Sequence, residues 1–150
     1  MSEIAEQDEF WEEREEKAGG KIQFQTFATF IGRSGEKRLD LGGLVYIINN
    51  IIYFEDFEKE SFFIKILGKK RKYSKTDLRF PLDTIQSVKE VSLGEGVNCI
   101  NGFISEKETK NISPFMKLFS NPILQLSMEG GGACFFDIMK RKEFIEILRS

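Results

Sequence analysis

The sequence contains no histidine, and this absence excludes several kinds of active site at once. Serine and cysteine triads, zinc-protease helices and most general acid–base designs that work near neutral pH depend on an imidazole. Two cysteines are also too few for a disulfide framework or a zinc site. We therefore expect neither a bound metal nor another cofactor, and we interpret Cys99 and Cys134, which stand in apolar stretches, as buried thiols.

Long apolar runs are missing as well. No stretch reaches the roughly 18 apolar residues that a membrane-spanning helix needs, and the start of the chain lacks the basic and apolar regions of a signal peptide. Only three prolines occur in 150 residues, of which 41% are hydrophobic and 31% charged. This composition predicts a folded domain in the cytoplasm, with peripheral association with a membrane as an alternative.

The acidic residues are concentrated at the N-terminus. Of the 24 acidic and 22 basic residues, eight acidic and two basic ones lie within the first 18 positions, so this segment carries −6 and the remainder +4. Residues 3–17 predict a helix, which a Gly–Gly pair ends. We place a domain boundary there: residues 1–20 form an acidic helical arm with a Gly–Gly linker, and residues 21–150 form the main domain.

The acidic arm has few apolar residues, and these are candidates for contact with a partner or with the main domain. They are Ile4, Phe10 and Trp11, of which Ile4 and Trp11 share one helix face. A further hypothesis is that the arm folds back near the basic residues 69–75 and competes with an anionic ligand, because a short tether keeps the two segments close. A solvated helix, or one that docks an outside partner, is the alternative.

From residue 21 onward the pattern is mainly β. Strands are predicted over residues 21–31, 44–48, 51–57, 77–80, 85–91, 97–104, 123–128 and 133–138, and a closing helix over residues 140–149. In the first strand the alternation of Ile22 and Phe24 shifts to Phe27 and Thr29, which predicts a long strand with a bulge.

The strongest local signal is the hairpin around Asn49-Asn50, since both residues tolerate the positive φ of a two-residue turn. Near the C-terminus, Leu124, Leu126 and Met128 alternate on one strand face before a run of three glycines.

Three segments, taken in chain order, resemble pleckstrin-homology and GRAM-type domains. The run GGLVYIINNIIYF resembles their second and third strands, and RFPLDTIQSV resembles the turn between strands four and five. The third segment, LQLSMEGGGACFFDI followed by KRKEFIEIL, resembles their last hairpin and C-terminal helix. This resemblance implies a seven-stranded, strongly bent antiparallel sheet, or partly open barrel, with a helix plugging one end. Residues 58–75 and 92–121 are longer than a minimal member needs, and we interpret them as insertions.

Two groups of basic residues are candidates for binding an anionic lipid or an acidic partner. The first is a run without acidic residues: Lys69, Lys70, Arg71, Lys72 and Lys75. The second lies in the segment that matches the lipid-binding loop of the resembled family: Arg33, Lys37 and Arg38. A solvated hairpin tip is the alternative for the first group. The Gly32-x-x-Gly35 pattern is also found in nucleic-acid-binding KH loops, but a strand-to-strand turn is favoured here.

The segment after Ser113 starts a short helical turn, because Pro114 takes the first helical position. It carries four large apolar residues: Phe115, Met116, Leu118 and Phe119. We expect it to pack as a lid over an open end of the sheet, with Phe115 and Phe119 as candidate contacts for a partner. An exposed apolar plug for a bilayer or a partner groove is the alternative.

These observations predict a non-catalytic binding module with a protein-interaction or scaffold role. Peripheral binding of anionic membrane lipids through residues 69–75 is the alternative, and RNA binding is a more distant one. The sequence shows no nucleophile–base pair, metal set or phosphate loop from which to argue catalysis.

Overall fold

The computed structural model describes residues 3–57 and 77–150, with their side chains from residue 8 to 57 and from residue 78 on. Seven strands form one sheet: β1 (Ile22–Arg33), β2 (Leu41–Ile48), β3 (Ile51–Asp56), β4 (Asp77–Pro81), β5 (Ile85–Val91), β6 (Ile123–Met128) and β7 (Ala133–Ile138). The helical elements are α1 (Glu3–Ala18), a 3₁₀ turn η2 (Leu82–Thr84), α3 (Leu93–Ile100), α4 (Pro114–Lys117) and α5 (Arg141–Arg149).

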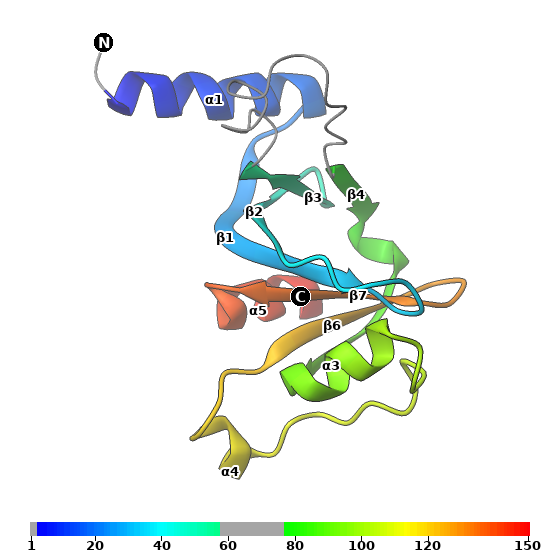
Figure 1. Ribbon diagram of the computed structural model, residues 1–150. Coiled ribbons are helices and arrows are strands. Elements are labelled where there is room, and N and C mark those ends of the chain that lie inside the picture. Colours follow the sequence, from blue (N-terminus) through cyan, green and yellow to red (C-terminus); the bar gives the residue numbers. More distant parts are fainter. Residues whose placement is uncertain (1–2, 58–76) are drawn as a thin grey trace, which may run out of the picture.

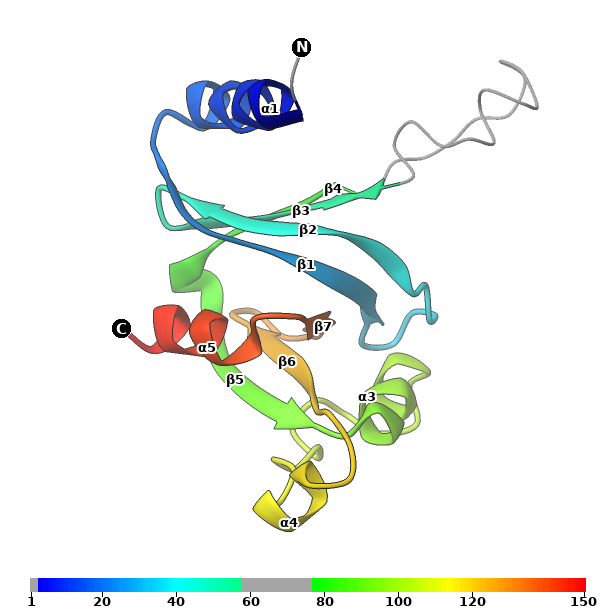
Figure 2. The same ribbon diagram turned by 90° about the vertical axis from the view of Figure 1, so that its left-hand side faces the viewer.

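The sheet is antiparallel throughout and follows the order β4-β3-β2-β1-β7-β6-β5. The long strand β1 pairs with β2 along most of its length and with β7 near its C-terminal end, so it belongs to both halves. The sheet curls around this strand into a half-barrel, with α5 beside its inner side and α1 and α4 at opposite ends of the molecule (Figures 1 and 2). The mainly β, seven-stranded architecture with a C-terminal helix is therefore as expected.

The inner side of the curled sheet holds the larger hydrophobic core. The fully buried rings of Phe30, Phe54 and Phe136 lie with their centroids 5.2 to 5.9 Å apart. From α5, Phe144 enters the same core and stacks against Phe24 at 5.6 Å. The apolar stripe of the C-terminal helix thus closes the open side of the sheet, which the helical spacing of its apolar residues predicted.

A second core lies on the opposite face of β1, β6 and β7. Because consecutive strand residues face opposite sides, Phe135 and Ile31 point away from the first core and pack with Ile100 and Cys99 of α3. The predicted strand over residues 97–104 is therefore wrong. Ser92 caps a helix there by accepting a hydrogen bond from the backbone N–H of Glu95, and burial of one helix face outweighs the β propensity of Val97 and Ile100.

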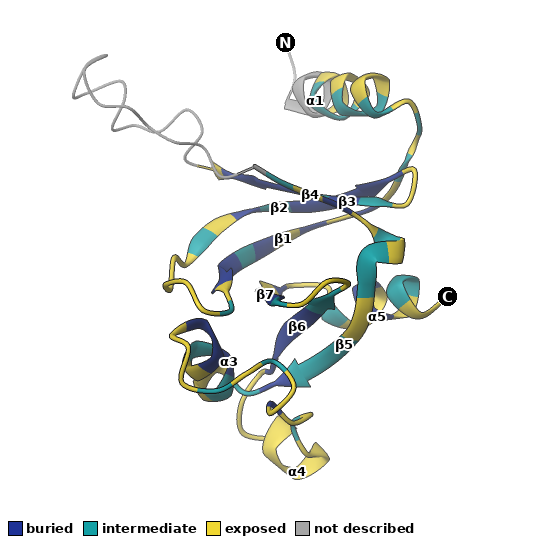
Figure 3. Cartoon of the chain, turned by 90° about the vertical axis from the view of Figure 1, so that its right-hand side faces the viewer, coloured by how far each residue is buried: buried dark blue, intermediate teal, exposed yellow. Residues whose placement is uncertain are grey.

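The predicted hairpin is confirmed, since Asn49 and Asn50 have φ of 52° and 59° and join β2 to β3. The long first strand is also confirmed, but its phase shift is wrong. Burial alternates without interruption from Phe24 to Phe30, so Thr26 and Ala28 face the core while Phe27 is 55% exposed. The register shifts lie instead near the two ends of the strand. Figure 3 shows how the buried strands contrast with the exposed α4.

Candidate functional site

The predicted site residues of the β1–β2 loop do not form an open basic cluster. Arg33 ends β1 and is exposed, as is Lys37, whereas Arg38 is engaged with Asp40 at 2.6 Å. The loop itself is fixed in place, because Ser34 exchanges two backbone-directed hydrogen bonds of 2.9 Å with Ala133. The positive charge of Arg38 is therefore compensated by Asp40 within the loop.

The other basic group lies outside the described residues. It consists of Lys69, Lys70, Arg71, Lys72 and Lys75. Their role as a lipid or acidic-partner site stays a prediction, and so does competition by the acidic arm.

The acidic arm is docked onto the sheet by its second half. Trp11 lies edge-on to Tyr46 of β2 at 5.4 Å and edge-on to Phe10 at 4.8 Å, and both arm residues are half-buried. The Gly–Gly linker is held as well, since Asn49 donates a hydrogen bond of 2.8 Å to the carbonyl of Ala18. Of the arm's three partner-contact candidates, Phe10 and Trp11 therefore already contact the protein itself, and the side chain of Ile4 lies outside the described residues.

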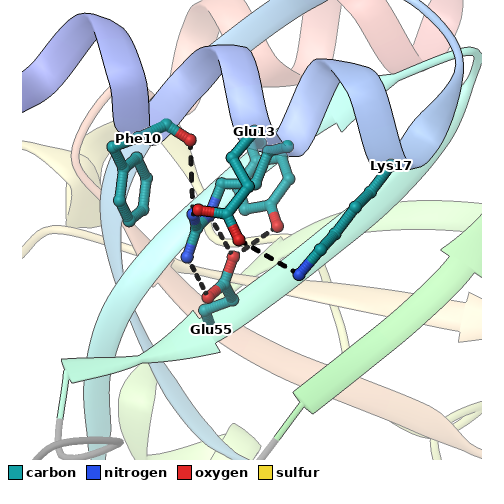
Figure 4. A network of polar contacts seen from close by, with 6 residues as sticks. Phe10, Glu13, Lys17 and Glu55 are labelled. Carbon is teal, nitrogen blue, oxygen red and sulfur yellow. Dashed lines mark hydrogen bonds and ion pairs between the residues drawn. The ribbon is translucent and has the colours of Figure 1, made fainter.

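One polar network joins the arm to the sheet (Figure 4). Arg14 donates two hydrogen bonds to Glu55, of 2.8 and 2.9 Å, and the hydroxyl of Tyr46 donates to the same carboxylate. The guanidinium carbon also lies 3.4 Å from the centre of the Phe10 ring. Burial alone would lower the pKa of Arg14, but Glu55 outweighs this effect and the net pKa is raised. No local sequence pattern predicts this pair, because its members are 41 residues apart.

The segment around α4 is the clearest candidate functional surface. Phe115, Met116, Leu118 and Phe119 are 66%, 47%, 77% and 70% exposed, and we call these four side chains the α4 knob. The rings of Phe115 and Phe119 contact each other at 5.2 Å. The predicted packed lid is therefore wrong, and the exposed plug describes this segment. The sheet face at this end is covered by α3 instead.

The knob is presented by an ordered scaffold. Ser113 caps α4 by accepting from the backbone N–H of Met116 at 3.2 Å, and Pro114 occupies the first turn, as the sequence predicts. At the base, Lys117 pairs with Glu90 of β5 at 2.5 Å, and the backbone N–H of Ile112 donates to the carbonyl of Glu90 at 2.6 Å. These contacts fix α4 to the sheet while its apolar side chains point to solvent.

A buried polar network holds the preceding connection, residues 101–112, against the sheet. Gln125 is fully buried on β6, where alternation alone would place it toward solvent; it bonds to Thr109 at 2.5 Å and to the carbonyl of Glu106 at 2.8 Å. Lys89 donates to the carbonyl of Thr109 at 2.9 Å. Because the buried side chains of Gln125 and Thr109 are hydrogen-bonded across this contact, the connection is held against the sheet.

A basic run shares a hollow with Asn121, a residue of the chain that leads from the knob to β6. A hollow of about 550 Å³ is lined by Asn121 and residues 137–143, and Asn121 follows the knob by two positions. This lining includes Lys140, Arg141 and Lys142, together with the 74% exposed Met139. From the sequence, Lys140, Arg141 and Lys142 were expected only as part of the closing helix over residues 140–149, although the three consecutive basic residues were a signal for an anionic ligand.

The two cysteines are confirmed as buried thiols and do not form a reactive site. Burial, with Glu106 and Glu108 nearby, raises the pKa of Cys99 to about 11, and burial raises that of Cys134. A thiol whose pKa rises from 9.0 to about 11 loses roughly a hundredfold of its thiolate at neutral pH. We expect neither cysteine to react with an aromatic disulfide reagent in the folded protein, and both to react in urea. Rapid labelling of Cys99 without urea would contradict this assignment.

Within residues 3–57 and 77–150, no helix is long and apolar enough to cross a membrane. Over the same part of the chain, no three Cys, Asp or Glu side chains gather in a metal-binding arrangement.

Comparisons with known proteins show the fold and nothing finer. No family model and no curated protein matches this chain. A solved structure, the C-terminal domain of an unknown protein from Leishmania infantum, is similar with a TM-score of 0.51 and 10% sequence identity. The match covers 95% of this chain and 93% of that chain. The class that the fold defines is thus a mainly β protein built on a curled, seven-stranded antiparallel half-barrel with helices at both termini.

Proposed function

We propose that this protein is a non-catalytic binding module that engages its partner through the α4 knob. The observation that carries the proposal is the exposure of four large apolar side chains within five consecutive residues, on a segment that is ordered at its base. Single exposed apolar residues are common on soluble proteins, but a contiguous group marks an interaction surface.

The proposal is compatible with a pleckstrin-homology-like binding role but does not require one. In the resembled family the ligand loop joins the first two strands, but here that loop carries an Arg38–Asp40 pair and packs against β7. The insertion between β5 and β6 supplies a different surface. A protein groove and a bilayer are the two apolar environments that accept such side chains, which matches the two partner classes that the sequence predicts.

Photo-cross-linking tests whether the knob is a contact surface. A photoreactive residue at Leu118 is compared with one at Glu146, an exposed position on α5, in a homogenate of cells that express the protein, membranes included. We expect adducts from position 118 alone, and their loss when Phe115→Ser and Phe119→Ser are added. Equal adducts from both positions, or none from position 118, would remove the knob as the binding surface.

A further inference from the structure

We infer that the α4 knob inserts into the interfacial layer of a lipid bilayer whose anionic headgroups are attracted by Lys140, Arg141 and Lys142. This inference rests on the proposed function and names the partner of the same surface. It differs from the lipid site expected from the sequence, which used residues 69–75.

The shape of the knob favours a bilayer over a protein groove. The helix α4 lies at the end of the molecule opposite α1, with only connecting chain on either side of it (Figures 1 and 2). Fluid acyl chains accept four exposed apolar side chains at the end of the molecule without a preformed cavity, whereas a protein groove must match their shape. At four residues, α4 is also too short to present the successive turns that a helix-binding groove reads.

The basic residues of the hollow that Asn121 lines favour an anionic bilayer. Lys140 and Lys142 are exposed, and Arg141 lines the same hollow as Asn121, two residues from Phe119. Asp137 and Glu143 line this hollow too, so its net charge is +1. Lys117 adds nothing to the attraction because Glu90 compensates it. We therefore expect the apolar contacts to supply most of the affinity and the basic run to supply a smaller, salt-sensitive part.

Vesicle co-sedimentation with the full chain measures both the apolar and the electrostatic contribution to membrane affinity. The vesicles are phosphatidylcholine alone, and phosphatidylcholine with one third phosphatidylserine. The variants are the pair Phe115→Ser/Phe119→Ser, the pair Lys140→Gln/Lys142→Gln, and the matched control Phe103→Ser. Phe103 is 77% exposed, like the knob, but lies in the turn after α3. Because all these side chains are largely exposed, urea unfolding curves should coincide with that of the unmodified protein.

We expect the unmodified protein to bind both vesicles, with tighter binding to the anionic ones. The double Ser variant should bind about a hundredfold more weakly to both, since each of the two buried rings contributes about a factor of ten. The double Gln variant should lose only the preference for phosphatidylserine, and Phe103→Ser should behave as the unmodified protein.

Insertion of the α4 knob below the headgroups is tested with lipids whose acyl chains are brominated. Relative to the unmodified protein, whose emission comes from Trp11 alone, the Phe119→Trp variant should show additional quenching by vesicles containing them, and the Phe103→Trp variant should not. Failure of the unmodified protein to bind at low salt, or undiminished binding by the double Ser variant, would overturn the inference. If position 118 still cross-links to a protein while vesicles are not bound, the knob remains the binding surface and only the bilayer is wrong.

Discussion

Replacement of Gly43 by alanine is expected to destabilise the protein by more than about 3 kcal/mol, because overpacking against backbone cannot be relieved by a rotamer change. Gly43 lies on β2 opposite Asp56 of β3. An added Cβ would overlap the carbonyl oxygen of Glu55 and come within 2.9 Å of the Asp56 Cα. β2 and β3 must then separate at Glu55, the residue whose carboxylate binds Arg14 of the arm. The midpoint of urea unfolding measures the loss.

The neighbouring glycine provides a matched control. At Gly42 the nearest atom to an added Cβ belongs to the Phe57 ring at 3.8 Å, which is an ordinary contact. We expect Gly42→Ala to change the free energy of unfolding by less than about 1 kcal/mol. Equal midpoints for the two variants would show that β2 and β3 do not approach as closely as described.

Replacement of Glu55 by alanine is expected to cost about 3 kcal/mol and to release α1 from the sheet. The side chains of Arg14 and Glu55 are only 14% and 11% exposed, so their attraction is little screened by solvent. The substitution leaves the partly buried Arg14 charge without the carboxylate that it contacts through two hydrogen bonds. Urea unfolding reports the stability, and amide hydrogen exchange in α1 reports its release.

A solvent-exposed ion pair on the same helix serves as a control that shows whether burial of the Arg14–Glu55 pair matters for stability. Glu13 contacts Lys17 at 3.2 Å, but these side chains are 60% and 76% exposed. We expect Glu13→Ala to change stability by less than about 0.5 kcal/mol. If Glu55→Ala and Glu13→Ala had the same effect, the docking of the arm would not depend on the buried pair.

This docking also bears on the hypothesis that the acidic arm competes with an anionic ligand. Deleting the arm would remove Arg14 from Glu55 together with the negative charge, so altered binding could reflect altered stability. Replacement of the exposed acids Glu9, Glu12 and Glu16 by glutamine keeps the Arg14 contact and changes only the charge.

Local patterns in the sequence determined much of the architecture. The turn at Asn49 and Asn50, the existence of strand β6 and the apolar stripe of α5 each follow from a pattern of residues close together along the chain. The cap at Ser113 and Pro114 is a local signal of the same kind.

Contacts between distant segments could be decided only by the tertiary structure. Residues 97–100 favour a strand by composition, yet they form part of α3 because a sheet face formed by β1, β6 and β7 must be covered. Because α3 already covers this sheet face, the α4 knob stays exposed. Gln125 is buried because residues 101–112 pack over it and accept its hydrogen bonds or donate to it. Arg14 and Glu55 likewise meet across 41 positions. Burial depends on what packs on each face, and no short sequence window contains that partner.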